Sequence, residues 1–156
     1  MFNQTLAWDY WSEDLAIGIA SIDDDHRRIL ETIARLHEAV GLDDPQPVID
    51  RTLALLQSYV DLHFRREEAM LRAAGYGGLA SHSAIHDTFR AYTREQVDSD
   101  EPKSAVLLLS YLVNWWTGHI ATEDKLYRQL VEGKPEALAA AGAVPPIPGV
   151  DAEPKP

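Results

Sequence analysis

The chain has 156 residues, 46% of them hydrophobic, and it contains no cysteine. Without cysteine it cannot form disulfides, thiolate metal sites or cysteine-ligated iron–sulfur clusters. Its 25 acidic and 14 basic residues give a formal net charge of −11, which argues against DNA or an anionic membrane as a partner. The N-terminus shows no signal peptide, and the most apolar segment, 105–116, is too short to span a bilayer. We therefore predict a single cytoplasmic domain with no nucleic-acid partner and no membrane insertion.

Four segments carry the apolar periodicity of amphipathic helices, and none alternates as a β-strand would. The predicted helices span about 22–40, from 45 or 47 to 73, from 79 or 81 to 98, and 103–131. Because the connections between them are short, we predict an all-α fold, an up-down-up-down antiparallel four-helix bundle.

The two ends of the chain differ from the predicted bundle. Residues 1–20 include Trp8, Trp11 and Ile17 and are too apolar for a free tail, so we predict an N-terminal arm packed on the bundle. Residues 133–156 hold six of the nine prolines, which predicts a mostly unstructured C-terminal tail. The helical domain is thus expected to occupy residues 1–132, arm included.

Histidines and acidic residues gather at one end of the predicted bundle. They are His26 in the first helix, His63 and Glu67 in the second, His82 and His86 in the third, and His119 with Glu123 or Asp124 in the fourth. In an antiparallel bundle, the starts of the first and third helices lie beside the ends of the second and fourth. With a rise of about 1.5 Å per residue, these side chains fall at one height.

A cluster of imidazoles and carboxylates without sulfur is typical of iron or manganese sites, and less specifically of zinc. Five histidines and two carboxylates are too many ligands for one ion with an open position. They suit two octahedral ions bridged by the carboxylates, with a position left for a small ligand. Without cations, burying these groups in a bundle would be costly.

Two other features are predicted to lie outside this cluster. His37 follows His26 by three helical turns, about 16 Å along the helix, too far to share a site. Arg65, Arg66 and Arg72 stand beside glutamates and are interpreted as a solvated helix face.

The motifs that surround these residues resemble those of the hemerythrins, specifically the single-domain bacteriohemerythrins. They are Trp8-Asp9, Ile22-Asp23-x-x-His26, HFRREEAM from His63, HSAIH from His82 and HIATED from His119. The resemblance extends from about Leu6 to Leu130. It implies a di-iron centre with an oxo or hydroxo bridge. It assigns His82, His86 and His119 to one iron, His26 and His63 to the other, and Glu67 and Asp124 to both as bridging ligands.

Helix geometry and the resemblance differ on the carboxylate in the fourth helix. Glu123 follows His119 by four residues and shares its face, whereas Asp124 lies about 140° around an ideal helix. The family pattern uses the later carboxylate, so we predict Asp124, turned inward by a local π-bulge.

The resemblance also implies that the iron held by two histidines has an open position for dioxygen. The predicted pocket residues around it are Trp116, Leu112 and Ile22. Trp116 stands where the family usually has a leucine over the dioxygen site, and it acts either on ligand access or only as core packing.

These features predict a monomeric dioxygen-binding protein for reversible uptake, storage or delivery, and not an enzyme. The sequence does not identify the protein that receives the oxygen. Two alternatives use the same centre. One is an enzyme acting on peroxide, nitric oxide or ferrous iron, and the other is an oxygen or redox sensor module.

Overall fold

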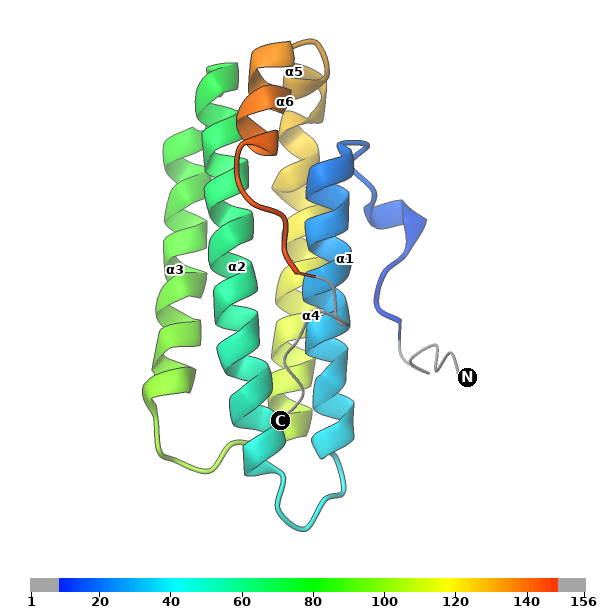
Figure 1. The fold of residues 1–156 in the computed structure, drawn as a ribbon, viewed down its shortest axis with the longest axis vertical. Helices are drawn as coiled ribbons and strands as arrows, with labels where there is room; N and C mark the ends of the chain where they lie inside the picture. Colours follow the sequence, from blue (N-terminus) through cyan, green and yellow to red (C-terminus); the bar gives the residue numbers. More distant parts are fainter. Residues whose placement is uncertain (1–8, 149–156) are drawn as a thin grey trace.

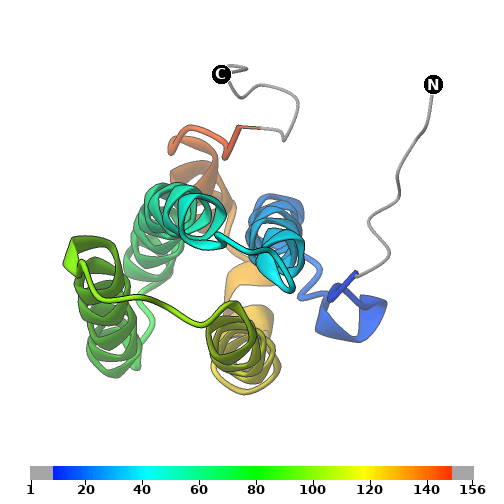
Figure 2. The same cartoon turned by 90° about the horizontal axis from the view of Figure 1, so that it is seen from below.

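The structure is a computed structural model that describes residues 9–148, and this part of the chain is helical with no strand. Its elements in chain order are η1 (Glu13–Leu15), α1 (Ala20–Ala34), η2 (Arg35–Ala39), α2 (Gln46–Ala74), α3 (Leu79–Asp98), α4 (Ala105–Thr122), η3 (Asp124–Tyr127), α5 (Arg128–Glu132) and α6 (Pro135–Gly142). Helices α1 to α4 alternate in direction along one long axis (Figure 1) and surround a common centre when viewed end on (Figure 2). The predicted antiparallel four-helix bundle is therefore confirmed.

The bundle forms because each long helix turns an apolar stripe inward. In α1 the stripe includes Ile22, Ile29 and Ile33, all fully buried, and they recur at the spacing of one helix face. Helix α2 ends at Gly75, whose φ of +69° places it in the left-handed region that closes many helices. The chain then turns directly into α3, which keeps the connection short.

The fourth predicted helix is interrupted. Helix α4 ends at Thr122, and the chain continues as the tighter 3-10 segment η3 before α5 begins at Arg128. The predicted continuous helix to about residue 131 is wrong at this point, and so is the expected π-bulge. A 3-10 segment has about three residues per turn, so it changes which side chains face the core. Asp124 and Tyr127 in η3 become buried, while Glu123 stays partly exposed.

The tail prediction is wrong for residues 135–142, which form α6. Proline at the first turn of a helix costs no hydrogen bond, and the alanines that follow favour helix, so the proline count misled the sequence analysis. Helix α6 packs on α2 and buries Ala137 and Ala141. Figures 1 and 2 show it lying outside the four-helix core, on the side of α2. Residues 149–156 lie outside the described range.

The segment before α1 lies against the bundle. Leu15 and Ile17 are part of the hydrophobic core, and Trp11 packs against it, while Trp8 lies outside the described residues. The carboxylate of Asp23 accepts hydrogen bonds from the backbone N–H groups of Ile17 at 2.8 Å and Gly18 at 3.0 Å. These bonds hold the turn into α1. Among the described residues, no helix is long and apolar enough to cross a membrane.

Candidate metal centre

Seven buried side chains converge between the four helices, near the end of the bundle where α2 meets α3. They are His26 from α1, His63 and Glu67 from α2, His82 and His86 from α3, His119 from α4 and Asp124 from η3. They form two groups, and in each group one potential ligand atom per residue lies within 4.8 Å of all the others. The first group contains Glu67, His82, His86, His119 and Asp124, and the second contains His26, His63, Glu67 and Asp124.

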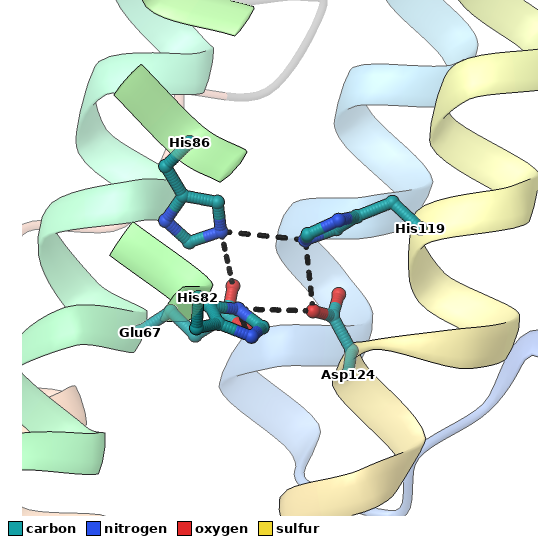
Figure 3. Close-up of side chains that lie close together, drawn as sticks. All are labelled: Glu67, His82, His86, His119 and Asp124. Carbon is teal, nitrogen blue, oxygen red and sulfur yellow. Dashed lines mark hydrogen bonds and ion pairs between the residues drawn. The ribbon is translucent and has the colours of Figure 1, made fainter. Parts of the chain in front are cut away.

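The first group is shown in Figure 3, where imidazoles from α3 and α4 face the two carboxylates. His82 Nε2 lies 2.7 Å from Glu67 Oε1 and 3.3 Å from Asp124 Oδ1. His119 Nε2 lies 3.0 Å from Asp124 Oδ1 and 3.3 Å from His86 Nε2. Three imidazole nitrogens and one oxygen of each carboxylate thus surround one point.

The second group uses the other oxygen of each carboxylate. His63 Nε2 lies 3.0 Å from Glu67 Oε2, and His26 Nε2 lies 3.1 Å from Asp124 Oδ2. The two imidazoles are 3.2 Å apart at their Nε2 atoms. Glu67 and Asp124 are therefore each shared between the two groups, with one oxygen close to a histidine of the first group and the other close to a histidine of the second, while Glu67 Oε2 also lies 3.8 Å from His86 Nε2. Carboxylates shared in this way could serve both groups as metal ligands.

Apart from imidazole nitrogens, the carboxylates of the centre lack the hydrogen-bond donors that burial normally demands. Glu67 Oε2 and both oxygens of Asp124 are buried, and their ion-pair contacts among residues 9–148 are to histidine nitrogens only. Anionic oxygens enclosed in this way are stabilised by metal ions, and the mixture of nitrogen and oxygen donors without sulfur suits iron. The residues present therefore fit a non-haem iron centre.

Protons compensate the two carboxylates in the metal-free protein. Burial and the charge of Asp124 oppose ionisation of Glu67, but hydrogen bonds with His63 and His82 outweigh them and lower its pKa to about 2. Burial alone would lower the pKa of His63, but hydrogen bonds with Asp25 and Glu67 raise it to about 9. The pKa of His82 is lowered by burial and raised more strongly by Asp124 and Glu67, to about 10. Metal ions must displace these protons, because imidazole binds a metal in its neutral form.

Two further carboxylates orient imidazoles from outside, and the sequence analysis missed both. Asp25 Oδ2 lies 3.2 Å from His63 Nδ1, and Glu68 Oε1 lies 2.9 Å from His86 Nδ1. Such partners fix the ring and leave Nε2 free for a metal. Asp25 precedes His26 and Glu68 follows Glu67, so a search for acidic residues beside predicted ligands could have found them.

Trp116 covers the second group. Its indole is fully buried, with ring centroids 5.6 Å from His63 and 6.2 Å from His26. Its Nε1 atom has no hydrogen-bond partner in the described part of the chain. Ile22 and Leu112 stand one turn before His26 and Trp116 on their helices and are also fully buried.

A second buried donor lies near Glu67 and Asp124. The Tyr127 hydroxyl, on η3, likewise has no hydrogen-bond partner within residues 9–148. Burial and the nearby charges of Glu67 and Asp124 raise the pKa of this phenol well above its ordinary value, so it stays protonated. The sequence analysis did not assign it a role, because only the 3-10 turn brings it inward.

Two residues that the sequence analysis considered lie outside both groups. Glu123 caps α4 and is partly exposed, so the structure brings Asp124 and not Glu123 to the cluster. His37 lies in η2, where its ring stacks on Tyr10 and its Nε2 contacts the Tyr10 hydroxyl. The predicted separation of His37 from His26 and the other ligands is confirmed.

A four-helix bundle that encloses such a cluster defines a class of cation-binding bundle proteins, and comparison with known proteins identifies the family. Residues 17–131 match the family described as the hemerythrin HHE cation binding domain. The chain belongs to the hemerythrin family.

Relatives extend across most of the chain. It is 28% identical to the bacteriohemerythrin of Clostridium acetobutylicum over 75% of this chain and 96% of the relative. It is 33% identical to a Pseudomonas aeruginosa bacteriohemerythrin over 75% and 77% of the two chains. A hemerythrin from Sipunculus nudus is 31% identical over 78% of this chain and 92% of its own. A crystal structure of a hemerythrin with one leucine replaced by tyrosine superposes with a TM-score of 0.72 at 25% identity, covering 78% of this chain and 95% of that one.

Proposed function

We propose that this protein binds dioxygen reversibly at a non-haem di-iron centre, for storage or delivery. The observation that carries the proposal is that the two oxygens of each carboxylate, in Glu67 and in Asp124, face different groups of histidines. Glu67 and Asp124 each direct one oxygen toward the three-histidine group and one toward the two-histidine group. A single metal ion would need only one of these groups. Family membership and the names of the bacteriohemerythrin relatives support iron and dioxygen as the metal and the ligand.

Each residue would have a defined role in this centre. One iron would be held by His82, His86 and His119, the other by His26 and His63, and Glu67 and Asp124 would bridge the two. When bound, the two ferrous ions supply the electrons and the coordination position that dioxygen needs. The group with fewer imidazoles would leave a coordination position for a small ligand, and the Trp116 indole packs beside its two imidazoles.

The surroundings favour binding over turnover. Trp116, Leu112 and Ile22 are fully buried and would exclude water from the open position. Tyr127 stays protonated and can only donate, so it does not act as a general base. The acidic, cysteine-free composition leads us to propose a cytoplasmic monomer.

The test is anaerobic loading with ferrous iron, followed by visible spectra in air and after purging. We expect two irons per chain and a band that appears with air and fades on purging. Loss of iron from His82→Ala but not from His37→Ala would tie the band to this centre. Two irons with a band that decays at once to a stable oxidised spectrum would favour the enzyme or the sensor instead. Fewer than two irons would refute the di-iron centre.

Replacing Trp116 with leucine is expected to shorten the lifetime of the oxygenated form about tenfold, equivalent to about 1.4 kcal/mol in the barrier. A smaller side chain leaves space beside His26 and His63 through which water and protons reach the open position. The measurement is the decay of the visible band in air-saturated buffer. Trp11→Leu, at a partly buried tryptophan that contacts Arg27 and belongs to neither ligand group, is the matched control. An unchanged decay in Trp116→Leu would show that the indole only fills the core.

A further inference from the structure

Arg66 is a buried cation that joins the C-terminal segment to the cluster. It lies on α2 beside Glu67, and only 3% of its side chain is exposed. This corrects its interpretation as part of a solvated face, since its neighbour Arg65 is exposed but Arg66 is not. A buried guanidinium is tolerated only when its charge and its N–H groups are satisfied.

Three backbone carbonyls beyond the four-helix bundle accept hydrogen bonds from Arg66. Nη1 donates to the carbonyl oxygens of Ala141 at 2.6 Å and Val144 at 2.8 Å, and Nη2 donates to that of Pro145 at 2.7 Å. The last carbonyls of a helix have no partner within it and carry its negative dipole end, so Arg66 caps α6. Ile147, which follows, is buried in the core. We call residues 135–147 the C-terminal clasp.

The remaining donor of Arg66 connects the clasp to His63. Its Nε donates to Asp25 Oδ2 at 2.8 Å, and the same oxygen lies 3.2 Å from His63 Nδ1. Asp25 therefore accepts from both side chains, which holds the His63 ring with Nε2 toward Glu67 and His26. A cavity of about 430 Å³ adjoins this connection between α1 and the clasp, with Pro146 and Ile147 in its wall. Release of the clasp would open Asp25 and Arg66 to water.

His86 provides an internal comparison. Its Nδ1 lies 2.9 Å from Glu68, which is paired with Arg90 of α3 at 3.0 Å. This second chain of contacts lies entirely within the four-helix bundle, and no residue of the clasp takes part in it.

We propose that the C-terminal clasp, acting through Arg66 and Asp25, positions the imidazole of His63 for metal binding. The inference rests on the proposed di-metal centre and adds a structural dependence to it. The clasp lies beyond residues 17–131, the range that matches the family, whereas Asp25, His63 and Arg66 lie within it. Asp25 and Arg66 act here as positioning residues.

The test uses the full chain, with zinc ions as a diamagnetic probe. Ala137 is buried against the bundle and Ala139 is exposed on the same helix, so Ala137→Glu should undock the clasp and Ala139→Glu should not. In Ala137→Glu we expect the affinity for one of the two zinc ions to fall by about 10- to 100-fold. This is the range typical of losing a hydrogen-bond partner that orients a metal ligand. Ala139→Glu should bind both ions as the unmodified chain does. Arg66→Lys is a second variant in case Ala137→Glu folds poorly. It keeps the positive charge but loses the planar guanidinium that donates to Asp25 and to the clasp carbonyls at once.

Proton–nitrogen NMR of the zinc-loaded protein separates positioning from general destabilisation. The His63 Nδ1–H signal should broaden or exchange faster in Ala137→Glu and Arg66→Lys, while the His86 Nδ1–H signal stays unchanged. Adding Ala137→Glu to Asp25→Asn should cause no further loss of zinc affinity. Equal changes at both histidines, or unchanged affinity in both clasp variants, would overturn the inference alone. Failure of the unmodified chain to bind two ions would overturn the di-metal proposal itself and this inference with it.

Discussion

Asp124→Ala is expected to reduce the iron content from two ions per chain to one or none, whereas Glu123→Ala keeps two. Asp124 is fully buried, and its two oxygens lie 3.0 Å from His119 and 3.1 Å from His26, on opposite sides of the cluster. Without that carboxylate, both groups of ligands lose an anionic oxygen. Glu123 is partly exposed and belongs to neither group. The measurement is colorimetric iron content after anaerobic loading and desalting.

The paired variants make this result decisive. Both remove a carboxylate from neighbouring positions at the end of α4, so a general effect of charge on iron uptake would appear in both. Circular dichroism would verify that the helix content of each variant matches that of the unmodified chain. Normal iron in Asp124→Ala together with iron loss in Glu123→Ala would reverse the assignment.

The metal-free protein is expected to lose stability as the pH rises from about 7 to 10. The pKa of His63 is raised to about 9 and that of His82 to about 10, both above the ordinary value of 6.5. Folding therefore favours the protonated forms of both histidines. Their contribution to the free energy of unfolding is fully present below pH 6.5 and is lost as the pH rises through 9 to 10. At about 1.4 kcal/mol per pKa unit, His63 alone accounts for about 3 kcal/mol. The pKa of Glu67 is lowered to about 2, so its contribution stays constant above about pH 4.5.

Metal ions should reverse this dependence. A bound cation takes the place of the protons on His63 and His82, so alkaline pH promotes metal binding and the loaded protein gains stability relative to the metal-free form. Urea unfolding at pH 6.5, 8 and 10 measures how the free energy of unfolding changes with pH, for the metal-free protein with a chelator and for the loaded protein with zinc. His63→Gln should make the free energy of unfolding of the metal-free protein less dependent on pH. A metal-free protein that becomes more stable above pH 8 would contradict the proton-compensated cluster.

Much of the bundle and most of the cluster could be predicted from local patterns. Helices α1, α2 and α3 follow from apolar periodicity, because side chains three and four residues apart share a face in any α-helix. The spacing of His63 with Glu67 and of His82 with His86 uses the same rule. The common height of the ligands followed from an antiparallel arrangement with short connections, and the structure brings all seven predicted side chains together.

Other features depend on contacts that no local pattern contains. Asp124 faces the cluster because α4 gives way to the 3-10 segment η3, and the i+4 rule alone would have chosen Glu123. Helix α6 was hidden by the proline-rich composition around it. Arg66 looked like a surface residue until its partners were known, since Asp25 lies 41 residues away in sequence and Ala141 lies 75 away.

The sequence by itself thus determined the helices, the ligand types and their common level in the bundle, because helical periodicity is a local property of the backbone. Only the tertiary structure decided which change of backbone turns Asp124 into the centre and which outer residues hold its histidines. Those choices depend on burial and hydrogen bonding between segments far apart in the chain, where a buried charge is kept only if distant groups satisfy it.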